Sequence, residues 1–398
     1  MPEAFLVGGA RTPVGRYGGA LSSVRPDDLA ALVVKEAVQR AGIPSEAVEE
    51  VILGNANGAG EENRNVARMA WLLAGFEDSV PGITVNRLCA SGMSAIIMAS
   101  HMIKAGAADI VVAGGVESMS RAPWVMAKPT TAFAKPGDAF DTSIGWRFVN
   151  PIFQAQEKTT YSMPETAEEV ARVDDISRED ADAFAAGSQE KALAAIAAGR
   201  FADEIVPVTV RTRKSETVVD TDEGPREGTT VEVLSKLRPV VKGGSVVTAG
   251  NASSLNDGAS AIVVASEAAI AKYGLTPRAR IADGASAGVP APIMGIGPVP
   301  ATHKVLDRTG WSLDDLGAVE LNEAFATQSL ACIRRLGLDP SIVNNDGGAI
   351  ALGHPLGSSG SRIAITLLGR MEREGADKGL ATMCVGVGQG TALLLERV

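Results

Sequence analysis

The sequence is poor in cysteine and in aromatic residues, and each shortage argues against a class of protein. Three cysteines occur in 398 residues and none has CxxC spacing, so we expect neither a disulfide framework nor a bound metal. Aromatic residues make up 4% of the chain against 44 glycines, which favours α/β loops over an aromatic-rich β fold. The chain shows no run of 18 apolar residues and no signal-type N-terminus. We therefore expect a cytoplasmic protein with no membrane partner.

The net charge restricts the expected binding partners, and the length of the chain sets the expected number of domains. The 37 Lys and Arg residues are outnumbered by 47 Asp and Glu residues, which gives a formal net charge of −10. This balance argues against nucleic acid or an anionic membrane as the main partner. Hydrophobic residues make up 45% of the chain, and its length exceeds that of one compact core, so we expect two or three domains.

Two sixteen-residue segments share a layout that indicates an internal duplication. "AGIPSEAVEEVILGNA" (41–56) and "TGWSLDDLGAVELNEA" (309–324) align without a gap, each with glycine second, an acidic turn and a strand-like apolar stretch. Each follows an amphipathic helical segment, the first of which opens at Pro26. Further along each half we expect a loop, a helix of small residues and a buried strand. Such alternation predicts mostly parallel sheets covered by helices.

Residues 121–248, called the lid below, interrupt this duplication. The segment is rich in proline, and two spacings typical of a capping box, Thr166-x-x-Glu169 and Ser177-x-x-Asp180, predict helix starts. Its second half gathers basic residues despite the acidic total: Arg211, Arg213, Lys214, Arg226, Lys236, Arg238 and Lys242. The cluster predicts either a site for an anionic ligand or a solvated charged surface.

One cysteine lies at a junction that favours reactivity. In "VNRLCASGMSAIIMAS", Cys89 precedes a run of small and apolar residues that reads as a helix ending near Lys104. A helix N-terminus favours an anion, so we expect the pKa of the Cys89 thiol to be lowered. The alternative is a small buried hydrophobic residue, which is how free cysteine often occurs.

The chain has three histidines that could act as a base for the Cys89 thiol. His101 follows Cys89 on the same helix about 18 Å away, which is too far. His303 lies near a predicted helix start and fits a surface or capping role. His354 stands in the glycine-rich "NNDGGAIALGHPLGSSG", where backbone segments approach closely. Because His-Pro occupies the place where a P-loop needs Lys-Ser or Lys-Thr, a nucleotide triphosphate site is not expected.

Four separate blocks then resemble the thiolase family. They are "NRLCASG", "NEAFA" (322–326), "GGAIALGHPLGSSG" and "CVGVGQG", and "TAGNASSLNDGA" (248–259) is similar to the family's linker out of its lid. The resemblance covers nearly the whole chain. It implies an α/β thiolase fold, in which two duplicated βαβαβαββ halves form a five-layered α/β/α/β/α core with an inserted lid. The implied domains are 1–120 completed by 249–270, the CoA-binding lid 121–248, and 271–398.

The resemblance also implies a mechanism, carried over residue by residue. Cys89 would be the nucleophile that carries the acyl group, and His354 would take its proton. Cys384 would be the second acid/base, acting at the α-carbon of acetyl-CoA. Asn322 would position a water in one oxyanion hole, and the backbone N–H groups of Cys89 and Gly386 would form the other. A ketosynthase of the same fold would instead carry a second histidine at position 384.

By the same resemblance, coenzyme A and acyl-CoA are substrates, no cofactor is permanently bound, and the subunits form dimers or tetramers. The implied CoA contacts are Met163, Arg226, Leu237, Ala249, Ser253 and Phe325. Candidate contacts to the acyl group are Arg147 and Met294. The chain departs from many thiolases at Ser162, in place of histidine, and at Val387, in place of glycine, which bears on acyl-chain specificity.

Within the family, the branch that acts on 3-oxoadipyl-CoA is the most similar. The blocks "RTPVGRYGGALSSVRPDDLAA", "ESMSRAPWVM", "FDTSIGWRFVNP" and "SMPETAE" carry this likeness. Acetoacetyl-CoA and longer 3-oxoacyl-CoA esters stay open as substrates, and a CoA-binding protein without turnover is the alternative of a different class. Arg147 in "FDTSIGWRFVNP" offers a fork-shaped donor for a distal carboxylate, unless it pairs with Asp141 or another acid of the lid.

Overall fold

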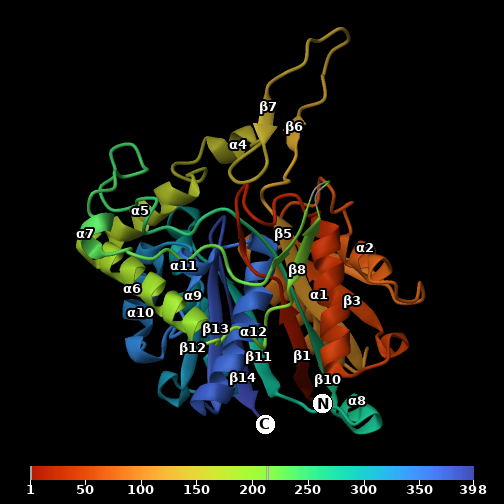
Figure 1. Cartoon of the computed structure of the whole chain (residues 1–398). Coiled ribbons are helices and arrows are strands. Elements are labelled where there is room, and N and C mark those ends of the chain that lie inside the picture. The colour runs from red at the N-terminus through yellow and green to blue at the C-terminus, as the bar shows by residue number, and fades with distance from the viewer. Residues whose placement is uncertain (1, 212, 214) are drawn as a thin grey trace.

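The duplication is visible in the order of the strands of the central sheet. A computed structural model describes residues 2–211, 213 and 215–398 (Figure 1), so Lys214 of the basic cluster lies outside the described residues. The sheet has ten strands in the order β12-β13-β14-β11-β1-β10-β5-β3-β4, with β2 beside β10. Their bounds are β1 (Ala4–Arg11), β2 (Gly15–Arg16), β3 (Glu50–Gly54), β4 (Gly82–Val85), β5 (Ile110–Ser118), β10 (Asn256–Ser266), β11 (Ala279–Gly288), β12 (Ala318–Leu321), β13 (Lys378–Val385) and β14 (Gln389–Arg397).

The two halves are hydrogen-bonded to each other through a short contact between β1 and β11. Within the sheet, the register pairs Phe5↔Arg280 and Leu6↔Ala279 join them. The expectation of a mostly parallel sheet is wrong, because among the described strands of this sheet only β3–β4, β3–β5 and β12–β13 run parallel. β13 and β14 follow each other across a short turn, and such a connection permits only an antiparallel pair.

Helices complete five layers around this sheet. The remaining elements outside the lid are α1 (Pro26–Ala41), α2 (Val66–Leu73), α3 (Ser91–Lys104), α8 (Glu267–Tyr273), α9 (Pro298–Thr309), α10 (Ala326–Leu336), α11 (Ala349–Leu352), α12 (Leu356–Glu374) and the 3-10 turns η1 (Ser45–Ala47), η2 (Leu88–Ala90), η3 (Ala291–Ile296), η4 (Leu313–Asp315) and η5 (Pro340–Ile342). α1 and α2 cover one face of the first half-sheet, and α9 and α10 cover the outer face of the second. α3 and α12 form the middle layer and share one apolar core with both half-sheets. The expected α/β/α/β/α architecture is confirmed.

The two aligned sixteen-residue segments have the same structure. Each begins where a helix ends, at Gly42 after α1 and at Gly310 after α9. Both glycines adopt a left-handed conformation, with φ of 68° and 70°, which closes the helix without steric cost. A 3-10 turn and a buried parallel strand then follow in each half.

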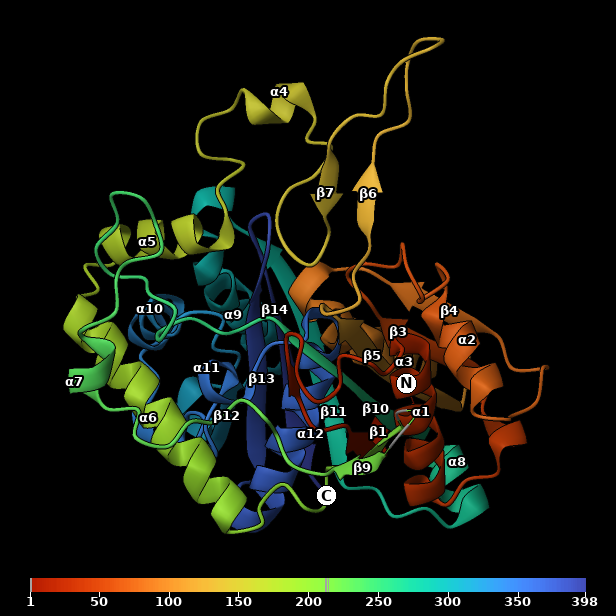
Figure 2. The ribbon, with the colours of Figure 1, turned by 45° about the horizontal axis from the view of Figure 1, so that its top comes forward.

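The lid stands on top of this core and reaches outward as a long hairpin (Figure 2). It contains β6 (Trp124–Met126), β7 (Ala139–Asp141), α4 (Pro151–Gln154), α5 (Met163–Val173), α6 (Arg178–Ala197), β8 (Val208–Arg211), β9 (Glu216–Val219) and α7 (Val231–Leu234). Ser177 caps α6 by accepting from the amide of Asp180, as its spacing predicts. The predicted start at Thr166 is wrong, because Ser162 and Glu165 form the capping box one turn earlier. Across the described residues, no helix has the length and apolar character needed to cross a membrane.

Candidate active site

Glycines let the two helices of the middle layer approach closely enough to bring their N-termini together. A β-carbon added to Gly92 of α3 would lie 2.7 Å from the carbonyl oxygen of Gly357 on α12, and one added to Gly360 would collide with Met93. α12 therefore also packs against η2, the turn that holds Cys89. His354 precedes α12 by two residues, so the crossing gathers the predicted nucleophile and base in one region.

Cys89 lies in the short η2 turn directly before α3, as the sequence predicts. The preceding residue, Leu88, has a φ of +48°, so the chain turns sharply here. The backbone N–H groups of Gly386 and of Cys89 itself are directed at the Cys89 sulfur. Burial nevertheless raises the pKa of the Cys89 thiol to about 11, and the carboxylate of Glu117 acts in the same direction. The expected lowering of this pKa is therefore wrong, because loss of solvent outweighs the helix terminus and the two amides.

His354 is held as a neutral base with a defined tautomer. Its Nδ1 lies 2.6 Å from the hydroxyl oxygen of Ser359, and that hydroxyl donates its proton to the carbonyl of Pro355 at 2.9 Å. Nδ1 must therefore carry the imidazole proton, which leaves the lone pair on Nε2. Burial lowers the pKa of His354 to about 3, and the nearby positive charge of Arg362 contributes.

Asn322 and Cys384 border the same region. Asn322 Nδ2 lies 3.5 Å from His354 Nε2, while its Oδ1 is buried and has no hydrogen-bond partner among the described residues. Cys384 is the second-last residue of β13 and packs in an apolar cluster with Met294 and Phe325. Burial and the neighbouring Cys89 raise the pKa of Cys384 well above its usual value. Both thiols are therefore protonated near neutral pH.

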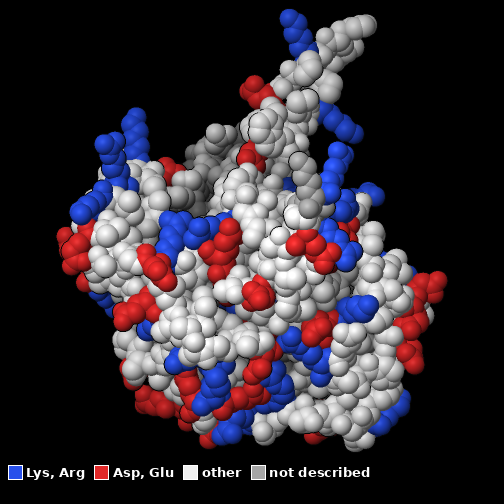
Figure 3. Space-filling model, viewed as in Figure 1, with Lys and Arg blue, Asp and Glu red and all other residues white. Residues whose placement is uncertain are grey.

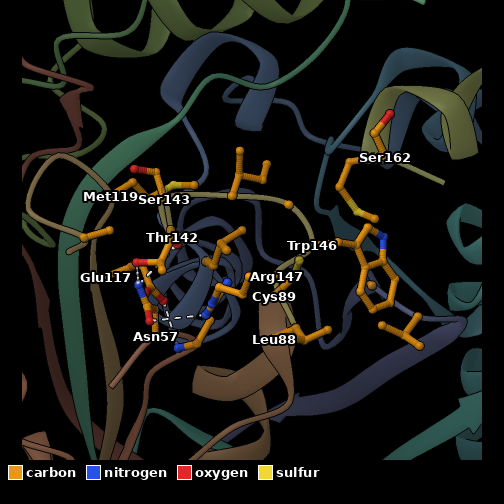
Figure 4. Close-up of a pocket in the computed structure, with 18 residues that line it drawn as sticks. Asn57, Leu88, Cys89, Glu117, Met119, Thr142, Ser143, Trp146, Arg147 and Ser162 are labelled. Carbon is orange, nitrogen blue, oxygen red and sulfur yellow. Dashed lines mark hydrogen bonds between the residues drawn. The ribbon is translucent and has the colours of Figure 1, made fainter. Parts of the chain in front are cut away.

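A cavity of about 350 Å³ opens beside Cys89, shown in Figure 4. Cys89 and Gly386 form one part of its wall, and lid residues 142–147 form another. Most of the remaining lining is apolar: Ala56, Leu88, Met119, Ala122, Met163, Leu356 and Val387. An acyl chain attached to Cys89 would thus lie in a mainly apolar space with few polar groups.

Arg147 is one of those polar groups. It lies on the cavity wall, and its Nη2 donates to Asn57 Oδ1 at 3.3 Å. The alternative pairing with Asp141 is not formed, because that carboxylate accepts from the amide and hydroxyl of Ser143 at 2.8 and 2.7 Å. In the described part of the chain no carboxylate lies within 4 Å of the guanidinium. The neighbouring Trp146 packs against Phe153 with tilted rings whose centroids are 5.6 Å apart.

The predicted CoA contacts are spread from the apolar cluster around Cys384 to the exposed surface of the lid. Met163 and Phe325 pack in the cluster that contains Cys384, and the amide of Ser253 donates to the carbonyl of Ala324. Leu237 lies against Gly250, next to the exposed Ala249. Arg226 is exposed on the lid and is fixed through its amide to Gln189. Figure 3 shows basic side chains gathered at the end of the molecule where α5 and α7 lie.

Several residues that position the groups of the site were not predicted from the sequence. Ser359 fixes the tautomer of His354, and Asn256 accepts from the amide of His354 at 2.9 Å. Glu117 lines the cavity and accepts from the amides of Ala56 and Gly357, both at 2.9 Å. Ser359 could have been found, since it follows the histidine within one glycine-rich block. Asn256, the first residue of β10, and Glu117, the second-last residue of β5, lie far from His354 in sequence, and no pattern in their own blocks linked them to the histidine.

One histidine and one cysteine lie outside the site. His303, predicted as a surface or capping residue, is exposed in the middle of α9, so it is a surface residue and not a cap. Cys332 is buried in α10, and its thiol lies 3.2 Å from the carbonyl oxygen of Gly295.

Comparisons with known proteins agree with this geometry. The family described as "Thiolase, N-terminal domain" matches residues 4–268, and "Thiolase, C-terminal domain" matches residues 275–397. The chain is 57% identical to the beta-ketoadipyl-CoA thiolase of Pseudomonas aeruginosa, covering 100% of this chain and 99% of the relative. It is 55% identical to the 3-oxoadipyl-CoA/3-oxo-5,6-dehydrosuberyl-CoA thiolase of Escherichia coli, over the full length of both. The acetyl-CoA acetyltransferase of Bacillus anthracis superimposes with a TM-score of 0.93 at 42% identity, covering 100% and 99% of the two chains.

Proposed function

The chain belongs to the thiolase family of acyltransferases, and on that premise we propose that it cleaves 3-oxoadipyl-CoA with coenzyme A into succinyl-CoA and acetyl-CoA. The names of the relatives from Pseudomonas aeruginosa and Escherichia coli support this substrate. The observation that carries the proposal is a single cavity whose wall contains both Cys89 and an Arg147 without a carboxylate partner among the described residues.

The first half-reaction forms an acyl-enzyme. Cys89 Sγ attacks the 3-oxo carbon while its proton passes to Nε2 of His354, which is free to accept because Ser359 holds Nδ1. The N–H groups of Gly386 and Cys89 stabilise the oxyanion that develops. The bond between C2 and C3 then breaks, and the carbanion at C2 takes the proton of Cys384. Acetyl-CoA leaves, and a succinyl group remains on Cys89.

The second half-reaction restores the thiol. Incoming coenzyme A gives its thiol proton to the Cys384 thiolate and attacks the succinyl carbonyl. Succinyl-CoA leaves, and Cys89 recovers its proton from the His354 imidazolium. Asn322 is assigned to a water that supports the thioester oxygen, since its buried Oδ1 lacks a protein partner within the described residues. Each group thus ends the cycle in its starting protonation state.

Coenzyme A is assigned to the lid. In this assignment the lid, 121–248, is an insertion between a first half, 1–120 completed by 249–270, and a second half, 271–398. The exposed basic side chains of Arg226, Lys236, Arg238 and Lys242 supply the positive charge that an anionic nucleotide needs on an acidic protein. Met294, packed against Cys384, is assigned to the side of the pocket where the thioester lies.

We also propose a cytoplasmic homo-oligomer, a dimer or a tetramer. The thiols of Cys89, Cys332 and Cys384 are all free, which suits a reducing compartment. β4 ends the sheet with Ile83 43% exposed, and the lid hairpin carries a fully exposed Phe133. Unpaired strand edges and exposed apolar side chains of this kind favour self-association. Light scattering on the purified protein gives the mass of the particle.

The test of the proposed reaction is a product analysis. The purified chain is incubated with 3-oxoadipyl-CoA and coenzyme A, and the products are identified by mass spectrometry. Succinyl-CoA and acetyl-CoA in equal amounts are expected, with a higher kcat/KM than for acetoacetyl-CoA. Turnover of acetoacetyl-CoA with none of 3-oxoadipyl-CoA would overturn the substrate assignment, and absence of turnover with both would overturn the function.

A further inference from the structure

The guanidinium of Arg147 is oriented by a neutral side chain, so no carboxylate neutralises its positive charge at this contact. Among the described residues, its guanidinium donates a single hydrogen bond, to the amide oxygen of Asn57 in the loop after β3. Both side chains border the cavity beside Cys89, and Figure 4 shows them directed at each other. The bond joins the first half of the core to the lid, so it fixes the lid arginine relative to the nucleophile.

The orientation of the Asn57 amide is set by Thr142. Asn57 Nδ2 donates to the hydroxyl oxygen of Thr142 at 2.8 Å and to its carbonyl at 3.2 Å. The Thr142 hydroxyl donates in turn to the carbonyl of Pro123 at 2.6 Å, so it can only accept from Asn57. With both amide protons engaged on that side, Oδ1 must face Arg147. Asn57 is 9% and Thr142 3% exposed, so water competes little for these bonds.

The acids near this arginine are engaged elsewhere. Asp141 is turned towards Ser143, and Glu117 accepts from two backbone amides of the core. A carboxylate in place of the Asn57 amide would form an ion pair with Arg147 and cancel its charge inside the cavity. A neutral acceptor orients the guanidinium without this cancellation.

We propose that Asn57 is a positioning residue for substrate selection: held by Thr142, it aims an unneutralised Arg147 at acyl chains that end in a carboxylate. This inference rests on the proposed function, in which Arg147 binds the distal carboxylate. Asn57 touches neither Cys89 nor the reacting carbons in this scheme. Its contribution therefore appears in the choice between substrates and not in the chemical step.

The test compares kcat/KM for 3-oxoadipyl-CoA and for acetoacetyl-CoA, which has no distal charge. Asn57→Asp should lower the ratio of the two values by about 10- to 100-fold, the range expected when a charge-assisted hydrogen bond to the substrate is lost. The fall should appear mainly as a higher KM for 3-oxoadipyl-CoA. Asn63→Asp is the matched control, because it places the same charge on an exposed position of the same loop, and it should leave the ratio unchanged.

A double variant separates positioning from a general disturbance of the loop. In an Arg147→Met background, Asn57→Asp should no longer change the ratio, because the group it acts through is gone. Thr142→Val, which removes the anchor of the amide, should lower the ratio in the same direction and serves if Asn57→Asp does not fold. An unchanged ratio in Asn57→Asp, while Arg147→Met lowers it, would overturn this inference and leave the proposed function standing. An unchanged ratio in Arg147→Met would overturn the assignment of Arg147 itself.

Discussion

The hydroxyl oxygen of Ser359 lies 2.6 Å from Nδ1 of His354. It accepts a hydrogen bond from the Nδ1–H group, because the Ser359 hydroxyl donates its own hydrogen to the carbonyl of Pro355. The imidazole therefore presents an unprotonated Nε2 towards Asn322. Since burial lowers the pKa of His354 to about 3, this neutral form persists across the whole physiological pH range. A neutral imidazole with its lone pair on Nε2 is the form that the proposed proton transfer from Cys89 requires.

Ser359→Ala should lower kcat by about 10- to 100-fold with little change in KM. The substitution leaves the Nδ1 proton of His354 buried without an acceptor and removes the constraint on its tautomer. Steady-state kinetics with acetoacetyl-CoA provide the measurement. Ser358→Ala is the matched control, because that neighbouring hydroxyl lies 2.9 Å from Ser260 and not against the imidazole. Equal losses in both variants would mean that Ser359 merely packs the helix.

Cys89→Ser should abolish acyl transfer and leave coenzyme A binding near that of the parent protein. A hydroxyl is a much weaker nucleophile and leaving group than a thiol in this exchange. Incubation with acetyl-CoA followed by peptide mass spectrometry should locate an acetyl group on Cys89. An acetyl group on Cys332, or on no cysteine, would contradict the assignment.

Cys384→Ala should separate the two half-reactions. Thiolysis should fall by about 10²- to 10⁴-fold, the usual contribution of a positioned acid/base, while acetylation of Cys89 by acetyl-CoA continues. Stopped-flow thiolysis and the same mass-spectrometric assay measure the two steps independently. Parent-like thiolysis by the variant would show that another group protonates the α-carbon.

Arg147→Met should lower kcat/KM for 3-oxoadipyl-CoA about 100-fold more than for acetoacetyl-CoA. The methionine fills similar space but offers no donor to a carboxylate, which is costly to bury unpaired. Arg172→Met provides a control, since it removes an exposed lid arginine that pairs with Glu169. Equal falls for both substrates would assign Arg147 to the stability of the lid.

Glu117→Gln should change the pH dependence of stability in a defined direction. Burial raises the pKa of Glu117 from 4.5 to about 7, so the folded protein holds this proton more tightly than the unfolded chain. Its contribution to stability is thus present below pH 4.5 and is lost as the pH rises towards 7. The free energy of unfolding of the variant relative to the parent should therefore rise between pH 4.5 and 7 and stay level outside that range. Denaturant titrations at several pH values measure it, and a constant difference would contradict the prediction.

The sequence alone determined the local elements of this protein. The small residues after Cys89 produce α3, and glycines at positions 42 and 310 end equivalent helices in left-handed conformations. Such features depend on neighbours along the chain, so patterns of a few residues suffice to predict them. The motifs around Cys89, Asn322, His354 and Cys384 carry the family resemblance, and that resemblance implied that these side chains border one region.

Only the tertiary structure decided how those groups behave. A pKa depends on solvent and charge from every side, so the burial of Cys89 raised a value that its position at a helix start predicted to be low. The partner of Arg147 was equally hidden, because Asn57 lies 90 residues away and meets it only when the lid folds onto the core. The antiparallel course of most strands follows from where the chain returns after the lid and after the turn at Gly386. Contacts between segments that are distant in sequence are set by tertiary packing, and no short sequence pattern predicts them.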